Sequence, residues 1–234
     1  MAKLVGTPAT VRIGRADRTE SERAGASARA AGRLREMIRA GRIRPGDRLS
    51  EEEWAGALEV SRNTLREAFR LLGHEKLVVH ELNRGVSVRR LGVDDVIDIY
   101  RVRRLVECAA VGRVATATPA DLGRLRAAVA EGDRAAACGE WLDVGTANIH
   151  FHQAIAALLG SPRVDETMGQ ILAELRLAFH AMPDERAFHL PYVGWNRRLF
   201  TLIVDGGADA AGAELEIYLA AAERQLVGAY PAGR

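Results

Sequence analysis

Residues 61–72 have the pattern of a short amphipathic helix whose exposed flank is basic. Ser61 can accept a hydrogen bond from a free backbone N–H, so the residues after it lie in the first helical turn. Apolar side chains recur with helical spacing and define the buried face: Leu65, Ala68, Phe69 and Leu72. The opposite flank carries Arg62, Asn63, Arg66 and Arg70. Guanidinium groups pair with guanine or phosphate and an asparagine amide pairs with adenine, so this helix is typical of one that enters a DNA major groove.

The neighbouring segments complete a DNA-binding unit. Residues 44–47 have turn chemistry, and residues 50–58 begin with a capping-box pattern that predicts a short helix. A very short corner separates that helix from the basic one. Residues 77–81 and 86–89 predict two strands of a hairpin with a basic tip. Each piece alone is most often a solvated surface, but their order predicts a winged helix-turn-helix that binds double-stranded DNA.

We therefore expect residues 22–91 to form a winged helix-turn-helix domain whose first helix covers 22–40. Residues 1–21 lack periodicity and predict a disordered arm, whose arginines either contact DNA or belong to a solvated tail. The predicted DNA contacts lie on the basic helix and on the hairpin: Arg62, Asn63, Thr64, Arg66, Asn83, Arg84 and Gly85.

Residues 42–52 (RIRPGDRLSEE), 60–68 (VSRNTLREA) and 83–85 (NRG) resemble the DNA-binding domain of GntR-family bacterial transcription regulators. Two positions depart from the family's pattern. Glu59 stands where the helix-turn-helix corner carries Gly, and a left-handed conformation there would cost about 1 kcal/mol. Asn63-Thr64 replaces the usual Thr-Pro among the base-reading positions, so the operator sequence cannot be transferred from relatives.

Charge is divided unequally along the chain. Residues 1–92 contain 19 Lys and Arg against 12 Asp and Glu, whereas residues 93–234 contain 14 against 19. The positive part is the one expected to face phosphate. Cys108 and Cys138 lie in helical patterns and predict buried free thiols rather than a bridge. No apolar run is long enough to cross a bilayer and no signal-peptide core is present, so we expect a cytoplasmic protein without membrane contact.

Residues 93–230 predict helices and no strand. Thr118-Pro119 and Ser161-Pro162 each combine an N-cap residue with proline at the first helical position. The other helical patterns cover 94–117, 140–159, 191–204 and 208–228, with a loop over 183–190. Six antiparallel helices form a bundle, so the predicted fold class is mainly α, a winged helix-turn-helix followed by an all-α domain. This layout resembles the FCD ligand-sensing domain of the FadR branch of GntR regulators.

Two charged residues interrupt the apolar stripe of the predicted helix 94–117. Arg103 and Glu107 stand on the same face as Val96, Tyr100 and Ala110, and burying an uncompensated ion is costly. Either the two residues neutralise each other at i, i+4 spacing, or Arg103 receives an anionic ligand. The FCD resemblance implies the second reading, because FCD domains place an effector-binding arginine here.

FCD domains also commonly hold a metal with one Asp and three His. Here the corresponding positions are Asn148, His152, Asn196 and Tyr218. Asn offers a neutral carbonyl and tyrosine a phenol with a pKa near 10, so only His152 stays a good ligand for zinc. We therefore predict no metal cofactor and expect these four residues, with Arg103, to bind the effector. His180 and Arg176 either line the same cavity or have ordinary packing and surface roles, whereas His150 projects elsewhere.

These features predict a homodimeric transcription regulator, since one recognition helix reads only a few base pairs. A small organic ligand in the helical domain, carrying a carboxylate or else neutral and polar, would control its affinity for the operator. One alternative is an architectural or constitutive DNA binder with a purely dimerising bundle. Another is a small-molecule enzyme that uses His152 and Glu107. The sequence argues against the enzyme, because it shows no nucleophile-base pair, phosphate loop or intact metal cluster.

Overall fold

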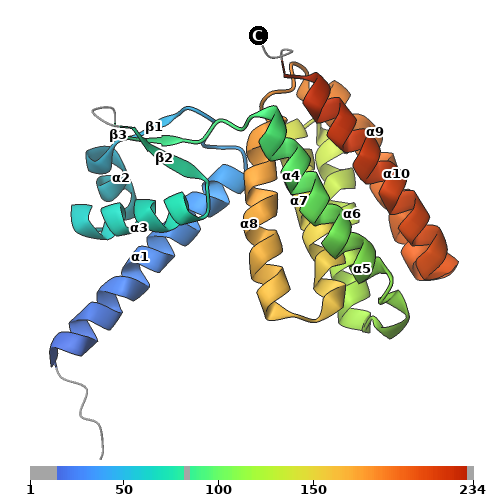
Figure 1. The fold of residues 1–234 in the computed structure, drawn as a ribbon, viewed down its shortest axis with the longest axis horizontal. Coiled ribbons are helices and arrows are strands. Elements are labelled where there is room, and N and C mark those ends of the chain that lie inside the picture. Colours follow the sequence, from blue (N-terminus) through green and yellow to red (C-terminus); the bar gives the residue numbers. More distant parts are fainter. Residues whose placement is uncertain (1–14, 82–84, 231–234) are drawn as a thin grey trace, which may run out of the picture.

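The computed structural model describes the backbone of residues 15–81 and 85–230, which forms two domains side by side (Figure 1). A winged helix-turn-helix precedes a helical bundle, so the predicted fold class is confirmed. The N-terminal domain contains α1 (Arg15–Arg39), β1 (Arg48–Leu49), α2 (Glu51–Leu58), α3 (Arg62–His74), β2 (Val78–Glu81) and β3 (Gly85–Val88).

Helix α1 begins earlier than the sequence indicated. Residues 1–21 were expected to be a disordered arm, but the backbone is helical from Arg15, so that prediction is wrong for residues 15–21. Arg, Ala and Glu make up most of this stretch, and they favour helix even without an apolar stripe. Residues 1–14 lie outside the described part of the chain. Further along α1, Leu34 and Ile38 are fully buried where the helix packs against α3.

The corner between α2 and α3 is fixed by two serine caps and one strained residue. Ser50 Oγ accepts a hydrogen bond from the Glu53 backbone N–H at 3.4 Å, and Ser61 Oγ accepts one from Thr64 at 3.1 Å. Between the helices, Glu59 adopts φ 56° and ψ 43°. The left-handed corner expected at Glu59 is therefore present, at a cost of about 1 kcal/mol relative to glycine.

The wing is a three-stranded antiparallel sheet in the order β1-β3-β2. Val78 pairs with Val88 and Glu81 with Gly85, as the predicted hairpin requires. Strand β1 was not predicted, because its two residues are too short for any periodicity. It places Arg48 opposite Ser87 on the outer side of β3.

The C-terminal domain, residues 93–228, is helical throughout its regular elements. Its main helices are α4 (Val93–Arg103), α5 (Ala109–Val111), α6 (Pro119–Cys138), α7 (Trp141–Ala156), α8 (Pro162–Phe179), α9 (Glu185–Thr201) and α10 (Gly207–Gly228). Two π-helical turns, η1 (Arg104–Cys108) and η4 (Leu202–Gly206), and two 3-10 turns, η2 (Val114–Thr116) and η3 (Ala157–Leu159), interrupt or extend them.

Two helices differ from the predicted ones. The run 94–117 contains η1, a wider π-helical turn at the buried Glu107, and its α-helix ends at Val111 rather than at 117. Helix α9 begins at Glu185 rather than 191, so the loop predicted over 183–190 is wrong for most of its length. Asp184 caps α9 by accepting a hydrogen bond from the Ala187 N–H at 2.9 Å, and Pro191 lies inside the helix rather than at its start.

Both cysteines are free, as predicted. Cys108 is half-buried, but Cys138 is exposed, so the expectation of a buried thiol is wrong at Cys138, the last residue of α6. In the part of the chain that the structure describes, no helix combines the length and apolar character that a bilayer span requires.

Candidate functional site

The first turns of α3 present the predicted DNA-reading side chains. Arg62, Asn63 and Arg66 are exposed. Thr64 is half-buried and its hydroxyl lies 2.8 Å from the Ser61 hydroxyl, so part of its hydrogen-bonding capacity belongs to the helix cap. Three of the four predicted α3 contacts are therefore free to reach a groove.

Carboxylates of α2 hold two of these arginines. Arg62 Nη2 lies 3.2 Å from a Glu52 oxygen, and Arg66 Nε donates to Glu51 at 2.8 Å. Both arginine side chains stay about three-fifths exposed, at 61% and 62%. Ion pairs at such exposed positions contribute little stability, so DNA phosphates or base edges can replace Glu51 and Glu52 at small cost.

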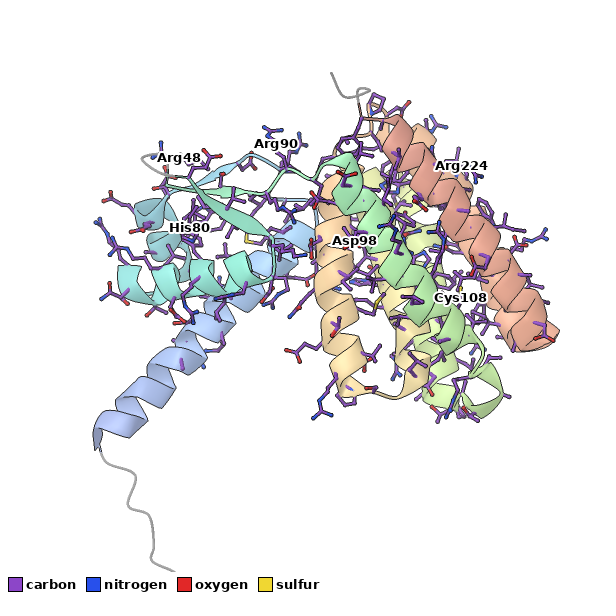
Figure 2. All side chains as sticks on the ribbon, viewed as in Figure 1. Arg48, His80, Arg90, Asp98, Cys108 and Arg224 are labelled. Atoms are coloured by element: carbon purple, nitrogen blue, oxygen red, sulfur yellow. The ribbon has the colours of Figure 1, made fainter. Side chains whose placement is uncertain are left out.

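The wing places a further cation beside this surface. Gly85 has φ 85°, which only glycine adopts without strain, whereas Asn83 and Arg84 lie outside the described residues. Arg48 Nε would be 3.8 Å from a Cβ built on Gly85, so Arg48 lies next to the hairpin end. Figure 2 shows Arg48 at the end of the sheet far from the bundle. Sequence reasoning missed Arg48 because it did not detect β1.

Inside the bundle, Arg103, Glu107 and His152 form one hydrogen-bonded chain. Arg103 is 1% exposed and Glu107 0%, and Arg103 Nε donates to Glu107 Oε1 at 2.7 Å. The other Glu107 oxygen lies 2.6 Å from His152 Nδ1. Mutual neutralisation of Arg103 and Glu107, one of the two readings left open by the sequence, is thus present.

Protonation states follow from burial and pairing. Burial alone would raise the pKa of Glu107, but Arg103 and His152 together hold it below its ordinary value, so the carboxylate is charged. Burial lowers the pKa of His152, with Arg103 acting in the same direction. A neutral His152 that donates from Nδ1 leaves Nε2 as an acceptor, and this atom has no partner within the described residues.

Asn148 and Tyr218 form a second buried pair, in which the Asn148 side-chain amide donates to the Tyr218 hydroxyl at 2.6 Å. Burial raises the pKa of Tyr218 well above its ordinary value, so the phenol is neutral. Asn196 is also buried, but no hydrogen bond joins it to the other four predicted effector residues, and its side-chain oxygen is unpartnered within the described chain.

A small cavity lies between these polar groups and a set of aromatic rings. Arg103, Asn148 and Tyr218 line it together with Tyr100, Phe179, Phe188, His189 and Tyr192. Its free volume is about 10 Å³, room for about one water molecule. Phe188 and His189 were not predicted, because the sequence assigned residues 183–190 to a loop; Tyr192 lies in the predicted helix 191–204 but was not singled out as a site residue.

The donor set does not suit a tightly bound metal. The Asn148 amide and the Tyr218 phenol bind each other, and Glu107 is held by Arg103. Among the described residues, no three His, Cys, Asp or Glu side chains cluster closely enough to hold a metal ion. His150 lies apart and binds Glu131 at 2.9 Å, as its projection predicted.

The two remaining candidates occupy the edge of the bundle facing the N-terminal domain. Arg176 is 1% exposed, and its guanidinium donates to the backbone carbonyls of Arg39 and Leu142 at 3.0 and 3.3 Å. Neither Arg176 nor His180 lines the small cavity, which corrects that expectation.

Two family models match this chain. Residues 26–88 match the model of bacterial regulatory proteins of the gntR family, and residues 98–221 match the FCD domain. The chain therefore belongs to the GntR family of bacterial transcription regulators, with a C-terminal FCD domain.

Individual relatives agree. A GntR-type transcription regulator structure from Rhodococcus sp. RHA1 is 46% identical, covers 88% of this chain and 99% of its own, and superposes with a TM-score of 0.81. The Nta operon transcriptional regulator of Aminobacter aminovorans is 32% identical over 58% of this chain, and the match spans only 65% of that relative. An uncharacterized HTH-type regulator in an unstable DNA locus of Streptomyces ambofaciens is 29% identical over 81% of this chain and 80% of its own length.

Proposed function

We propose that this protein binds operator DNA as a homodimer and that a small organic ligand in the FCD domain controls the binding. The observation that carries the proposal is the exposed basic face of α3 beside the wing, joined in one chain to a bundle with a buried arginine facing a cavity. Since the family consists of transcription regulators, catalysis in the bundle is not part of the proposal.

The ligand is a carboxylate in this proposal. Arg103 holds Glu107 through Nε, but one terminal nitrogen, Nη2, is buried without a partner in the described chain. An unsatisfied buried charged donor costs free energy that an incoming oxygen would recover. The neutral Arg103–Glu107 pair supports a second candidate, a neutral polar ligand. In either case aromatic side chains must move, because the cavity holds about one water molecule.

A paired substitution tests the ligand site. Arg103→Met alone would leave Glu107 buried without its cation, so it should be combined with Glu107→Gln, which removes both charges at once. We expect this double variant to keep operator affinity and to lose the effect of the ligand on that affinity. Fluorescence anisotropy with labelled operator, in the presence of benzoate, lactate or citrate and of neutral benzamide, separates a carboxylate from a neutral ligand. A ligand response equal to wild type would place the effector elsewhere, and no response to any ligand in the wild type would favour a constitutive DNA binder.

We also propose that the protein holds no resident metal. After mild chelation, elemental analysis of purified protein should find far less than one zinc, nickel or manganese ion per chain. The variant Asn148→Asp/Asn196→His/Tyr218→His should gain affinity for zinc, because it restores ligands that zinc prefers. One chelator-resistant metal per wild-type chain would contradict the proposal.

Exposed apolar side chains on the bundle support the homodimer. Leu105 in η1 is 76% exposed and Ile217 in α10 is 58% exposed. These two elements pack together, with Arg104 bound to Glu223 and Cys108 to Glu216, so both side chains belong to one surface. Leu105→Glu/Ile217→Glu should shift the protein to monomer in sedimentation analysis, whereas Val204→Glu, at an exposed position on η4, should not. An unchanged dimer in the double variant would exclude this surface.

A further inference from the structure

The two domains meet around an open cleft that is separate from the small bundle cavity. Arg44, Pro45, Arg90 and Leu91 line it from the N-terminal domain and the connection to α4. The end of α8 and the loop after it, 177–185, form the opposite wall, and Tyr230 completes it. The free volume is about 550 Å³. This lies in the range of small-molecule sites, whereas the bundle cavity holds about one water molecule.

Two arginines line this cleft, and one of them, Arg90, also lines a neighbouring depression on the wing together with Gly46. Arg44 and Arg90 are exposed and line it, and neither forms an ion pair with the residues that the structure describes. Gly46 has φ 88°, and a Cβ at this position would collide with the Arg90 guanidinium, so the glycine makes room for Arg90 against the turn. Figure 2 shows Arg90 at the end of the sheet next to the bundle, away from Arg48. Acidic groups near the cleft are Glu185 in the lining, Asp47, which accepts a hydrogen bond from the Arg44 backbone N–H, and Asp95, which acts on Tyr230.

His180 closes the inner end of the cleft with an unsatisfied polar atom. Its Nε2 is buried and has no partner within the described residues. Burial, together with Arg176 and Arg44, lowers the pKa of His180 to about 4, so the ring is neutral near pH 7. Behind it, the buried Arg176 donates to two backbone carbonyls and lies over the Phe179 ring, and the carboxylates of Glu185 and Asp143 act on its charge. The inner wall therefore carries the charge of Arg176 next to the buried Nε2 of His180, with Glu185 of the lining as a partial counter-charge.

We propose that this cleft is a second ligand site, for an organic anion. A carboxylate or phosphate group would lie between Arg44 and Arg90 with His180 at its inner side. The apolar part of the ligand would pack on Leu177, Met182 and Tyr230. Guanidinium groups bind both kinds of oxyanion in a forked geometry, so the two sources share one recognition chemistry.

The position of the cleft gives such a ligand a role in regulation. One wall moves with the wing and the other with the bundle, so a molecule that contacts both favours the domain arrangement in which the walls face each other. Direct contacts between the domains are already present: Arg89, at the end of the wing, binds Asp95 of α4 at 2.6 Å and Glu174 of α8 at 3.3 Å. The site would act on this junction directly, independently of the Arg103 cavity.

Calorimetric titration of the full chain with phenyl phosphate, benzoate and uncharged phenol tests the proposal. We expect phenyl phosphate and benzoate to bind, and their relative affinities to show whether the site takes a phosphate or a carboxylate. Phenol should bind at least tenfold more weakly than these anions. Arg44→Gln/Arg90→Gln should lower the affinity for the tighter-binding anion at least tenfold. The matched control Arg42→Gln/Arg101→Gln removes two exposed arginines outside the cleft and should bind it as the wild type does. Arg103→Met/Glu107→Gln should leave phenyl phosphate binding unchanged, which separates this site from the bundle cavity, whose proposed ligand is a carboxylate.

Several results would overturn the second site. Equal losses of anion affinity in Arg44→Gln/Arg90→Gln and in Arg42→Gln/Arg101→Gln would show only a general charge effect. Loss of phenyl phosphate binding in Arg103→Met/Glu107→Gln would place the anion in the bundle cavity instead. Phenol binding as tight as that of the anions, or no anion binding at millimolar concentration, would exclude an anion site. Weaker operator binding by Arg44→Gln/Arg90→Gln without any anion binding would show that these arginines face the DNA backbone.

Discussion

Glu107→Gln is expected to lower the free energy of unfolding by about 3–5 kcal/mol, the usual loss when one partner of a buried ion pair is removed. Glutamine keeps the size of the side chain and can still accept from His152. It leaves the guanidinium of Arg103, which is 1% exposed, without a counter-charge in the bundle interior. Urea denaturation at a fixed protein concentration measures the change.

Two variants make this result specific. Asp98→Asn removes an exposed carboxylate from the same helix and should change stability by less than about 0.5 kcal/mol. Arg103→Met/Glu107→Gln should be more stable than Glu107→Gln alone, because no unpaired charge remains. A Glu107→Gln protein as stable as Asp98→Asn would mean that water reaches Arg103 and that the pair is not dry.

The difference between wild type and Glu107→Gln should also depend on pH. Arg103 and His152 outweigh burial and hold the pKa of Glu107 below 4.5 in the folded protein. The stability contributed by its charge is therefore present above the unfolded pKa and is lost as pH falls through the lower folded value. The two proteins should differ most near neutral pH and converge in acid.

The N-terminal domain could be predicted because its signals are local. Ser61 caps its helix, Glu59 stands at the left-handed corner, and the two hairpin strands follow from the apolar and β-branched runs 77–81 and 86–89. Strand β1 could not be predicted, since two residues have no period and pair only after the chain has folded. As a consequence, Arg48 beside the wing and Arg90 at the domain junction emerge only from the tertiary structure.

The bundle was predicted in outline but not in its site. The sequence showed the i, i+4 spacing of Arg103 and Glu107, and an ion pair between them was one of the two readings it left open. The π-helical turn η1 was not visible, because an α-helical period assumes uniform turns. The helix was predicted to begin at residue 191, whereas α9, capped by Asp184, begins six residues earlier at Glu185 and brings Phe188 and His189 to the cavity. Cavity volume depends on how aromatic rings from four helices, α4, α8, α9 and α10, meet, and no local pattern contains that information.

Arg66→Ala is expected to weaken binding to the operator by about 1–3 kcal/mol, roughly 5- to 150-fold, if Arg66 reads a base. The side chain lies in the second turn of α3 and is 62% exposed, and among the described residues it pairs with Glu51 of α2. Truncation removes a forked donor from the groove-facing surface while the buried face of α3 stays intact. Anisotropy with an operator selected from random duplexes, compared with unrelated DNA, measures both affinity and specificity.

Glu51→Gln is the matched test, because it releases Arg66 and leaves the arginine in place. The exposed ion pair contributes little to stability, so folding should be unaffected. Removing a carboxylate beside the DNA backbone should keep or increase operator affinity, and the slope of affinity against salt should stay steep. If Arg66 contacts a phosphate instead of a base, Arg66→Ala should weaken DNA binding equally on all sequences and lower that slope by about one. Operator binding by Arg66→Ala as tight as that of the wild type, or wild-type binding that does not depend on salt, would mean that α3 is not the reading helix. The basic face that carries the proposed function would then be only a solvated surface.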